Sequence, residues 1–347
     1  MTRFSGLLGI GLLAGLCPVQ SANSIFVDTT TEGLLEFSPT LVHSDGSDPA
    51  GGQIVDSEST AYGVDHGGVA QIVNGSGDMT CTGALLGSGE HVLIAGHCAS
   101  SGLSAVFDVG GTSVTMPVVE TAVHPNYNGV IFHGYGVGVL TLEGPAPAEI
   151  PRYDLNRSLN DLGVTGVAVG YGASGHGATG ATVSKGQKRA GLIEFEINAL
   201  PSPIMQNTAT QLTADFDSGD PSNDAMALYY GLAPDLGFGA DEIAFAPGDS
   251  GSPVFQKQAG GWVIAGVASY VARFTPPSST IPHSDVDAVR NSSFGEFSVA
   301  ARVAEPNVLS FIDDIAGVSS VTPIPEPTTG LLALIGFSLC CLRRRLY

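Results

Sequence analysis

A serine and a histidine that lie far apart in the chain constrain this sequence more than any other feature. Ser250 lies in the hexapeptide Gly248-Asp249-Ser250-Gly251-Ser252-Pro253, and His97 lies in Ile94-Ala95-Gly96-His97-Cys98. A serine hydroxyl is a poor nucleophile at neutral pH, so it needs an imidazole within hydrogen-bond reach and backbone N–H groups that hold a developing oxyanion. The small residues around Ser250 leave its backbone open. The two segments therefore predict acyl-transfer chemistry and a fold that brings them together.

Both segments resemble those of the trypsin/chymotrypsin-like serine proteases, which carry an AAHC-like histidine segment followed by a GDSGGP-like nucleophile loop. Three further segments fall in register with the family's strands, namely Cys81 to Leu86, Val169 to Gly172 and Val263 to Tyr270. The resemblance runs from about Ile54 to Ile315. It implies an all-β fold of two antiparallel Greek-key β-barrels with a short C-terminal helix, and it implies a serine endopeptidase that acts on protein or peptide substrates.

The resemblance also implies a role for individual residues. His97 and Ser250 are the expected base and nucleophile, and the N–H groups of Gly248 and Ser250 form the expected oxyanion hole. Further positions are implied for the substrate pocket (Ala244, Ser269, Tyr270, Val271), for a disulfide beside the histidine (Cys81, Cys98) and for an activation pair (Ile54, Asp249). Because Ala244 offers no acid to a Lys or Arg side chain, we expect a small or medium apolar residue before the cleaved bond. No cofactor is implied, and two cysteines with scattered histidines do not make a metal site.

The acid of the family's triad is missing. The turn His124-Pro125-Asn126-Tyr127 and the strand 136–142 match the family, but Gly136 stands where the family has Asp. No Asp or Glu lies between Glu120 and Glu143. The acid normally fixes the histidine tautomer and stabilises the imidazolium, and replacing it by an amide lowers turnover about 10⁴-fold in an intact triad.

Three interpretations of Gly136 remain open. In the first, the protein is an active protease in which Asp108, Asp154, the hydroxyl of Ser269 or water orients His97. In the second, it is a weakened or inactive relative that keeps the fold for binding. In the third, the sequence is a variant of an active parent. Retention of both His97 and Ser250 favours an enzyme. Gly136 favours a surface-anchored binding protein that recognises protein or polysaccharide.

The two ends of the sequence predict export and sorting. Residues 1–24 have the pattern of a signal peptide, with Arg3 before an apolar run and small residues at the expected cleavage site. In residues 319–347, Pro325-Glu326-Pro327 precedes the apolar segment 330–342 and three arginines, and this order resembles a PEP-CTERM tail of Gram-negative bacteria. That resemblance implies transient inner-membrane anchoring and removal by an exosortase-like enzyme. We expect the protein in the periplasm, on the outer surface or in the extracellular matrix.

Residues 25–53 are interpreted as a propeptide or linker, because they are polar with clustered Gly, Ser, Asp and Pro. Ile54-Val55 then lies where the family's activated N-terminus lies. Cleavage after Gln53 would free an amine that pairs with Asp249. The alternative is that Ile54 merely begins a strand, since Asp56 replaces the usual glycine.

The remaining chain is expected to be one protease domain over residues 54–318, with barrel one at about 54–143, barrel two at about 160–304 and a helix at about 306–316. Abundant Gly and little charge suit short strands joined by tight turns. Apolar runs predict strands of the first barrel at 69–73, 84–86, 92–95, 114–119 and 137–142. The net charge of −20 argues against nucleic-acid binding, which needs basic patches. The acidic run Asp215 to Asp220 could bind calcium, but it lacks the ligand series of an EF-hand loop, and a solvated loop is the favoured interpretation.

Overall fold

The structure is a computed structural model that describes part of the 347-residue chain. It describes the backbone of residues 25–29, 33–38, 41–43, 53–54 and 60–317, except 110, 201, 203 and 279, and it describes side chains from residue 61 onward. The expected signal peptide and the expected sorting tail lie outside these residues. Within them, no helix combines the length and the apolar character needed to cross a membrane.

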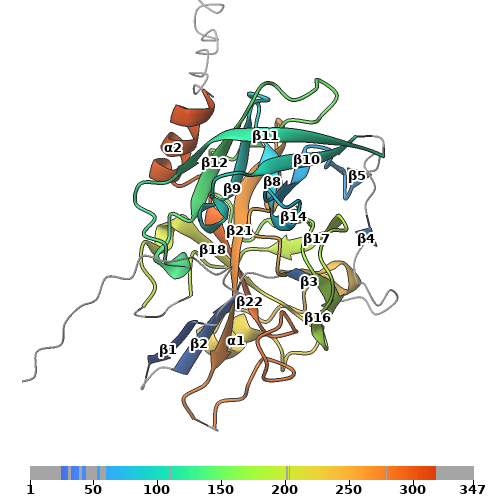
Figure 1. Ribbon diagram of the computed structural model, residues 1–347. Coiled ribbons are helices and arrows are strands. Elements are labelled where there is room, and N and C mark those ends of the chain that lie inside the picture. Colours follow the sequence, from blue (N-terminus) through green and yellow to red (C-terminus); the bar gives the residue numbers. More distant parts are fainter. Residues whose placement is uncertain are drawn as a thin grey trace, which may run out of the picture.

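The first half of the described chain forms a closed barrel, as the sequence predicts (Figure 1). Neighbouring strands pair in the order β10-β11-β12-β9-β8-β7. Two strands, β7 and β12, have the bounds expected from their apolar runs, whereas β10 was not predicted. The strands are β7 (Val69–Val73), β8 (Met79–Leu85), β9 (His91–Ala95), β10 (Ser104–Val109), β11 (Thr112–Val123) and β12 (Val137–Leu142).

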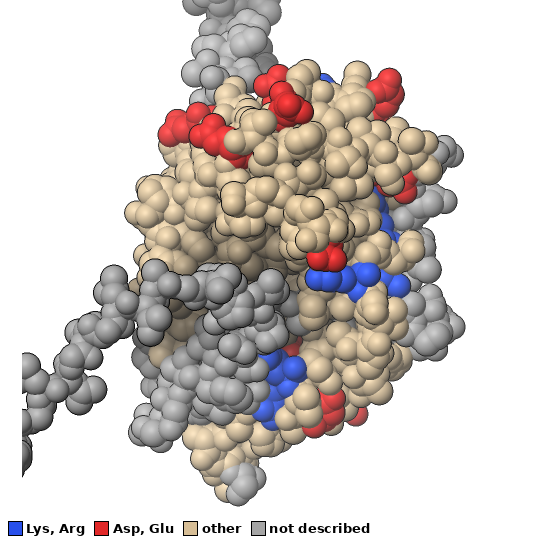
Figure 2. All heavy atoms as spheres, in the orientation of Figure 1, with Lys and Arg blue, Asp and Glu red and all other residues tan. Residues whose placement is uncertain are grey.

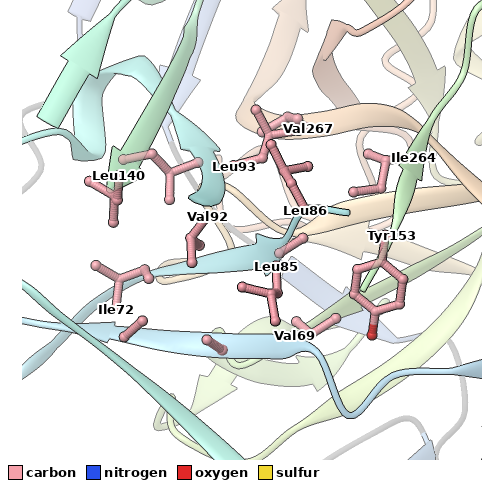
Figure 3. Close-up of a cluster of buried hydrophobic side chains, with 14 of the residues drawn as sticks. Val69, Ile72, Leu85, Leu86, Val92, Leu93, Leu140, Tyr153, Ile264 and Val267 are labelled. Carbon is pink, nitrogen blue, oxygen red and sulfur yellow. The ribbon is translucent and has the colours of Figure 1, made fainter. Parts of the chain in front are cut away.

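The core of this barrel continues into the second half of the chain (Figure 3). Branched aliphatic side chains such as Ile72, Val92 and Leu140 fill the barrel, because alternate residues of each strand point inward. Leu86 of the first barrel shares the same cluster with Ile264 and Val267 of β21 (Gly261–Thr275). Each such side chain contributes about 1.5–3 kcal/mol by leaving water. The shared core therefore holds the two halves in one arrangement.

The second half forms a sheet whose strands pair in the order β18-β22-β21-β20-β14-β17. Its two ends are joined by residues that follow β17, because the N–H of Thr213 donates to the carbonyl of Ile197 (2.8 Å) and the N–H of Glu196 donates to the carbonyl of Thr213 (2.9 Å). The expected two-barrel, all-β fold is confirmed. The further strands are β14 (Thr165–Gly170), β17 (Arg189–Glu194), β18 (Gln211–Asp215), β20 (Pro253–Gln258) and β22 (Phe297–Arg302).

The segment interpreted as a propeptide contains short strands that the sequence analysis did not predict. β2 (Gly33–Ser38) pairs with β1 (Ile25–Thr29) and with residues 271–275 of β21. β3 (Leu41–His43) pairs with β19 (Ile243–Phe245), so that Val42 lies opposite Ala244. β4 (Gln53–Ile54) pairs with β17. This segment therefore lies along strands of the second barrel that border the predicted substrate pocket.

The predicted C-terminal helix is present as α2 (Pro306–Ala316). It begins at Glu305, whose carboxylate accepts hydrogen bonds from the N–H groups of Asn307 and Val308. A second helix, α1 (Ala225–Tyr230), was not predicted. The remaining short strands are β5 (Thr60–Ala61), β6 (Val64–Asp65), β13 (Asp154–Leu155), β15 (Ser174–His176) and β16 (Gly180–Val183).

Candidate active site

The predicted base and nucleophile meet between the two barrels. Nε2 of His97 lies 2.7 Å from Oγ of Ser250. His97 lies in a single 3-10 turn (Gly96–Cys98) that directly follows β9, and Ser250 lies in the loop that leads into β20. With Nε2 unprotonated, the serine hydroxyl donates this hydrogen bond, which is the geometry that a general base needs to accept its proton.

The backbone around Ser250 contains the two N–H groups that the sequence analysis assigned to an oxyanion hole. Within the described chain, the N–H groups of Gly248 and Ser250 donate no hydrogen bond, whereas the carbonyl of Ser250 accepts one from the N–H of Thr82 (2.9 Å). Gly251 has a φ of +92°, and a Cβ there would lie 2.1 Å from the carbonyl oxygen of Thr82. Glycine is therefore needed at position 251, and two amides remain free for a ligand oxygen.

Asp249 is fully buried and is held by groups of the second barrel. Its carboxylate accepts hydrogen bonds from the N–H of Gly172 (2.9 Å), the N–H of Ala246 (3.3 Å) and Oγ of Ser252 (3.1 Å). Burial nevertheless raises the pKa of Asp249 well above its ordinary value. A Cβ on Gly172 would lie 1.7 Å from this carboxylate, which explains a glycine in the Val169 to Gly172 segment. Its expected partner, Ile54, is described only as backbone in β4, so the activation pair stays a prediction.

Thr82 holds the nucleophile loop, and the sequence analysis did not single it out. Besides the bond to Ser250, its hydroxyl donates to the carbonyl of Gly248 (3.0 Å) and accepts from the N–H of Tyr171 (3.2 Å). Thr82 is fully buried. A sequence signal existed, since Thr82 is the one polar residue in the otherwise small and apolar segment 81–86.

Gly136 lies directly beside the histidine segment. Its carbonyl accepts a hydrogen bond from the N–H of Gly96 (2.8 Å). A Cβ on Gly136 would lie 3.4 Å from Oγ of Ser269 and 4.0 Å from the ring of Tyr127, with no other neighbour within 4 Å. The hydroxyl of Tyr127 is buried and has no hydrogen-bond partner in the described chain, and burial raises its pKa to about 12. The space beside Gly136 is therefore open and is bordered by the hydroxyl of Ser269 and the ring of Tyr127.

The protein groups proposed as substitutes for the acid do not hydrogen-bond to His97. In the described structure, neither Asp108 nor Asp154 nor the hydroxyl of Ser269 hydrogen-bonds to the imidazole. Asp108 instead lines a cavity with Lys188, and Asp154 lies beside Gly87.

The pKa of His97 reflects this isolation. The side chain of His97 is exposed to solvent on one side. The protein atoms that surround the rest of the ring remove part of its hydration, and this desolvation lowers the pKa of His97 below the ordinary value of 6.5. Desolvation has this direction because it disfavours the charged imidazolium. No carboxylate raises the pKa in return.

The residues expected to form the substrate pocket are brought together on β19 and β21. Ala244 and Val271 are fully buried in one apolar cluster. Ser269 and Tyr270 precede Val271 on β21, and the hydroxyl of Tyr270 donates to Oε1 of Gln211 (2.6 Å). The expected set contains no acidic side chain that could pair with a Lys or Arg of a substrate.

The cysteines behave as the resemblance implies, since Cys81 and Cys98 form a disulfide with their Cα atoms 6.2 Å apart. Two further histidines lie at the ends of strands: His91 begins β9 and His176 ends β15. His124 is buried, stacks on Tyr135 and packs against α2.

Comparison with known proteins agrees with this geometry. The family model described as Trypsin matches residues 55–224, a stretch that contains the disulfide, His97 and Gly136 and ends before Ser250. The match supports the trypsin/chymotrypsin-like serine protease family and a serine-type peptide hydrolase. No curated protein matches the chain.

Proposed function

We propose that this protein is an exported serine endopeptidase of trypsin-like fold whose activity is reduced by the glycine at position 136. The observation that carries the proposal is the 2.7 Å approach of Nε2 of His97 to Oγ of Ser250. The free amides of Gly248 and Ser250 beside this pair supply the second requirement of acyl transfer, which is stabilisation of an oxyanion.

The mechanism follows from these groups. Oγ of Ser250 attacks the peptide carbonyl while Nε2 of His97 accepts its proton, and the carbonyl oxygen becomes an oxyanion between the two amides. His97 then protonates the leaving amine, and an acyl-enzyme remains on Ser250. Water, deprotonated by His97, attacks the acyl-enzyme and releases the acid and the free serine.

The glycine at position 136 is expected to slow these reaction steps in two ways. Among the residues that the structure describes, no partner fixes the tautomer of His97, and no negative charge stabilises the imidazolium that forms when the serine loses its proton. The lowered pKa of His97 also makes it a weaker base. The oxyanion hole and substrate binding remain, and these alone supply about 10³–10⁴-fold acceleration over water when a triad is damaged.

The substrate is proposed to be a peptide with a small or medium apolar side chain before the cleaved bond. Ala244 and Val271 support this preference, because both belong to one buried apolar cluster. A library of peptides that differ at this position tests it. Rapid cleavage after Lys or Arg would contradict the preference.

Residues 25–53 are proposed to be an inhibitory propeptide. The support is that β2 pairs with β21 through Ser38 and Val271, on the strand that the family resemblance assigns to substrate binding. An extended peptide substrate would use the same backbone groups by adding a strand to this edge. Cleavage after Gln53 would then free both the strand edge and the amine of Ile54.

Export and sorting are proposed from the sequence of residues 1–24 and 319–347. A disulfide between Cys81 and Cys98 agrees with an oxidising compartment. Replacing Glu326 in the Pro-Glu-Pro tripeptide is expected to prevent tail removal, and unchanged processing, followed by mass spectrometry of the exported protein, would contradict the PEP-CTERM interpretation.

The alternative function is a surface binding protein on the same scaffold, and Gly136 is the observation that favours it. The two functions are separated by assaying the purified protein, without its propeptide, on an apolar peptide library, with Ser250→Ala as the matched control. Hydrolysis that disappears in the control supports the protease. Equal, background hydrolysis by both proteins supports the binding function.

A further inference from the structure

Three aspartates of the acidic run and its neighbourhood converge inside the second barrel. One carboxylate oxygen each of Asp215, Asp217 and Asp224 lies within 4.8 Å of the other two. Asp215 ends β18, Asp217 follows it, and Asp224 is the residue before α1. The expectation of a solvated loop is therefore wrong for this part of the run.

These carboxylates differ from the acidic side chains seen on the surface. On the face shown in Figure 2, the acidic groups are scattered and accessible. Asp215, Asp217 and Asp224 are only 4%, 5% and 2% exposed. None of them forms an ion pair with a Lys or Arg of the described chain. Three buried acids thus share one site without a protein cation.

The hydrogen bonds of the cluster orient its oxygens but leave one without a partner. Oδ2 of Asp215 accepts from the N–H of Met226 (2.8 Å), and the two oxygens of Asp224 accept from the N–H groups of Ala227 (2.7 Å) and Asp235 (3.0 Å). Oδ1 of Asp217, in contrast, is buried and has no hydrogen-bond partner among the described residues. A buried carboxylate oxygen without a partner costs free energy, so such an atom calls for a ligand.

The surrounding groups increase the demand for positive charge. Glu242 lies beside Asp217, since its Oε1 accepts from the N–H of Asp217 (3.1 Å), and Glu196 lies beside Asp215. The N–H of Asp215 donates to Oε2 of Glu196 (3.4 Å), which brings a further carboxylate to the cluster. Either protons or a metal ion must compensate the charges gathered here.

We propose that Asp215, Asp217 and Asp224 bind a divalent cation, and that calcium is the cation they select. A hard cation prefers carboxylate and carbonyl oxygens, which is the donor set that the site offers. Calcium accepts irregular oxygen cages with few waters, whereas magnesium needs near-octahedral geometry and usually keeps several waters. Oxygens that accept one N–H bond keep a lone pair for the metal.

The place of the site in the fold gives the cation a structural consequence. The cation would join the end of β18 to the start of α1. Glu242, which accepts a hydrogen bond from the N–H of Asp217, directly precedes β19 and so links the site to that strand. β19 carries Ala244 and leads to the loop of Ser250. A bound cation would therefore stabilise the long connection 216–242 that enters the candidate active site.

The test uses the full chain carrying Ser250→Ala, so that the result does not depend on peptidase activity. After treatment with a chelator, calcium is titrated in a calorimeter and the thermal midpoint is measured with and without calcium, with magnesium as a parallel arm. We expect one calcium to bind and the midpoint to rise by about 5 °C or more at a calcium concentration about 100 times the Kd. Magnesium is expected to produce a smaller rise.

Two Asp→Asn variants make the test specific. Asp217→Asn removes the unpartnered carboxylate and should weaken calcium binding at least tenfold, while its midpoint without calcium should be no lower than that of the parent. Asp220→Asn is the matched control, because Asp220 is exposed in the same loop, and it should bind calcium like the parent. The proposal is overturned if the parent binds no calcium, if magnesium binds as tightly, if Asp217→Asn binds equally well, or if both variants lose binding to the same extent.

Discussion

The proposed reduction in activity depends on a single residue, Gly136. Gly136 is held against Gly96 by a backbone hydrogen bond, and the space above its Cα faces the hydroxyl of Ser269 and the ring of Tyr127. The backbone thus retains the position of an orienting acid while the side chain is absent. His97 keeps its contact to Ser250, but no other described residue hydrogen-bonds to its imidazole and no described carboxylate supplies a counter-charge.

Restoring the acid is therefore expected to increase activity. In Gly136→Asp, the open space should admit the carboxylate with little strain, so we predict at least a tenfold rise in kcat/KM, with the approximately 10⁴-fold effect of an intact acid as the upper bound. Gly136→Asn is the matched control, since it has nearly the same volume without the charge. Peptide hydrolysis by the three proteins checks this. An Asp variant no faster than the Asn variant would show that the site already has an orienting group.

The pH dependence of peptide hydrolysis should also respond to the carboxylate introduced in Gly136→Asp. His97 acts as a base only when it is unprotonated, and its pKa is lowered in the folded protein. The acidic limb of the kcat/KM profile is therefore expected below pH 6.5 in the natural protein, with activity retained as the pH falls through that value. In Gly136→Asp the nearby negative charge favours the imidazolium, so the limb should move to higher pH. Limbs at the same pH in both proteins would argue against contact between the introduced carboxylate and His97.

Thr82 offers a test of how the nucleophile loop is held. Thr82→Val keeps the shape but removes the hydroxyl, so the buried carbonyl of Gly248 and the buried N–H of Tyr171 each lose a partner. We predict that the free energy of unfolding falls by about 2–4 kcal/mol, because each unpaired group costs about 1–3 kcal/mol. Thr82→Ser keeps the hydroxyl and should lose less. Urea denaturation of the three proteins measures the difference, and equal losses in Val and Ser variants would assign the effect to packing alone.

At the scale of secondary-structure elements, the accuracy of the sequence analysis followed the apolar content of each segment. β7 and β12 are rich in the aliphatic residues that pack the barrel, and their bounds were predicted correctly. α1 was missed because its six residues depend on tertiary contacts, including the bond from Met226 to Asp215. The burial of Asp215 and Asp217 was also missed, because an acidic sequence indicates solvent exposure until the fold gathers the carboxylates together.

The pairing of β2 with β21 predicts an effect of the N-terminal segment on activity. Replacing residues 50–53 with a recognition sequence for a specific protease would allow cleavage just before Ile54. Cleavage should raise peptidase activity at least tenfold, because it frees the strand edge at Val271. Adding the separate peptide of residues 25–53 to the cleaved enzyme should inhibit it again. Unchanged activity after complete cleavage, verified by N-terminal sequencing, would contradict the propeptide interpretation.

At the scale of the whole molecule, two barrels with a shared core place two residues from distant parts of the chain in contact. Leu86 packs with Ile264 and Val267 across the junction, and Thr82 ties the first barrel to the loop of Ser250. The sequence motifs predicted this arrangement well, because the segments that carry the chemistry also carry the small residues that the close approach of backbones requires. The motifs could not predict the surroundings of Gly136. These surroundings depend on Tyr127, which follows β11, and on Ser269, which lies on β21.

The most direct measurement is to treat the purified protein, without its propeptide, with a fluorophosphonate and to locate the adduct by mass spectrometry. If His97 activates Ser250, one adduct should form on Oγ of Ser250, it should form much more slowly in His97→Ala, and it should be absent in Ser250→Ala. No adduct on Ser250, or an adduct that forms equally fast without His97, would contradict the proposal that this pair performs acyl transfer.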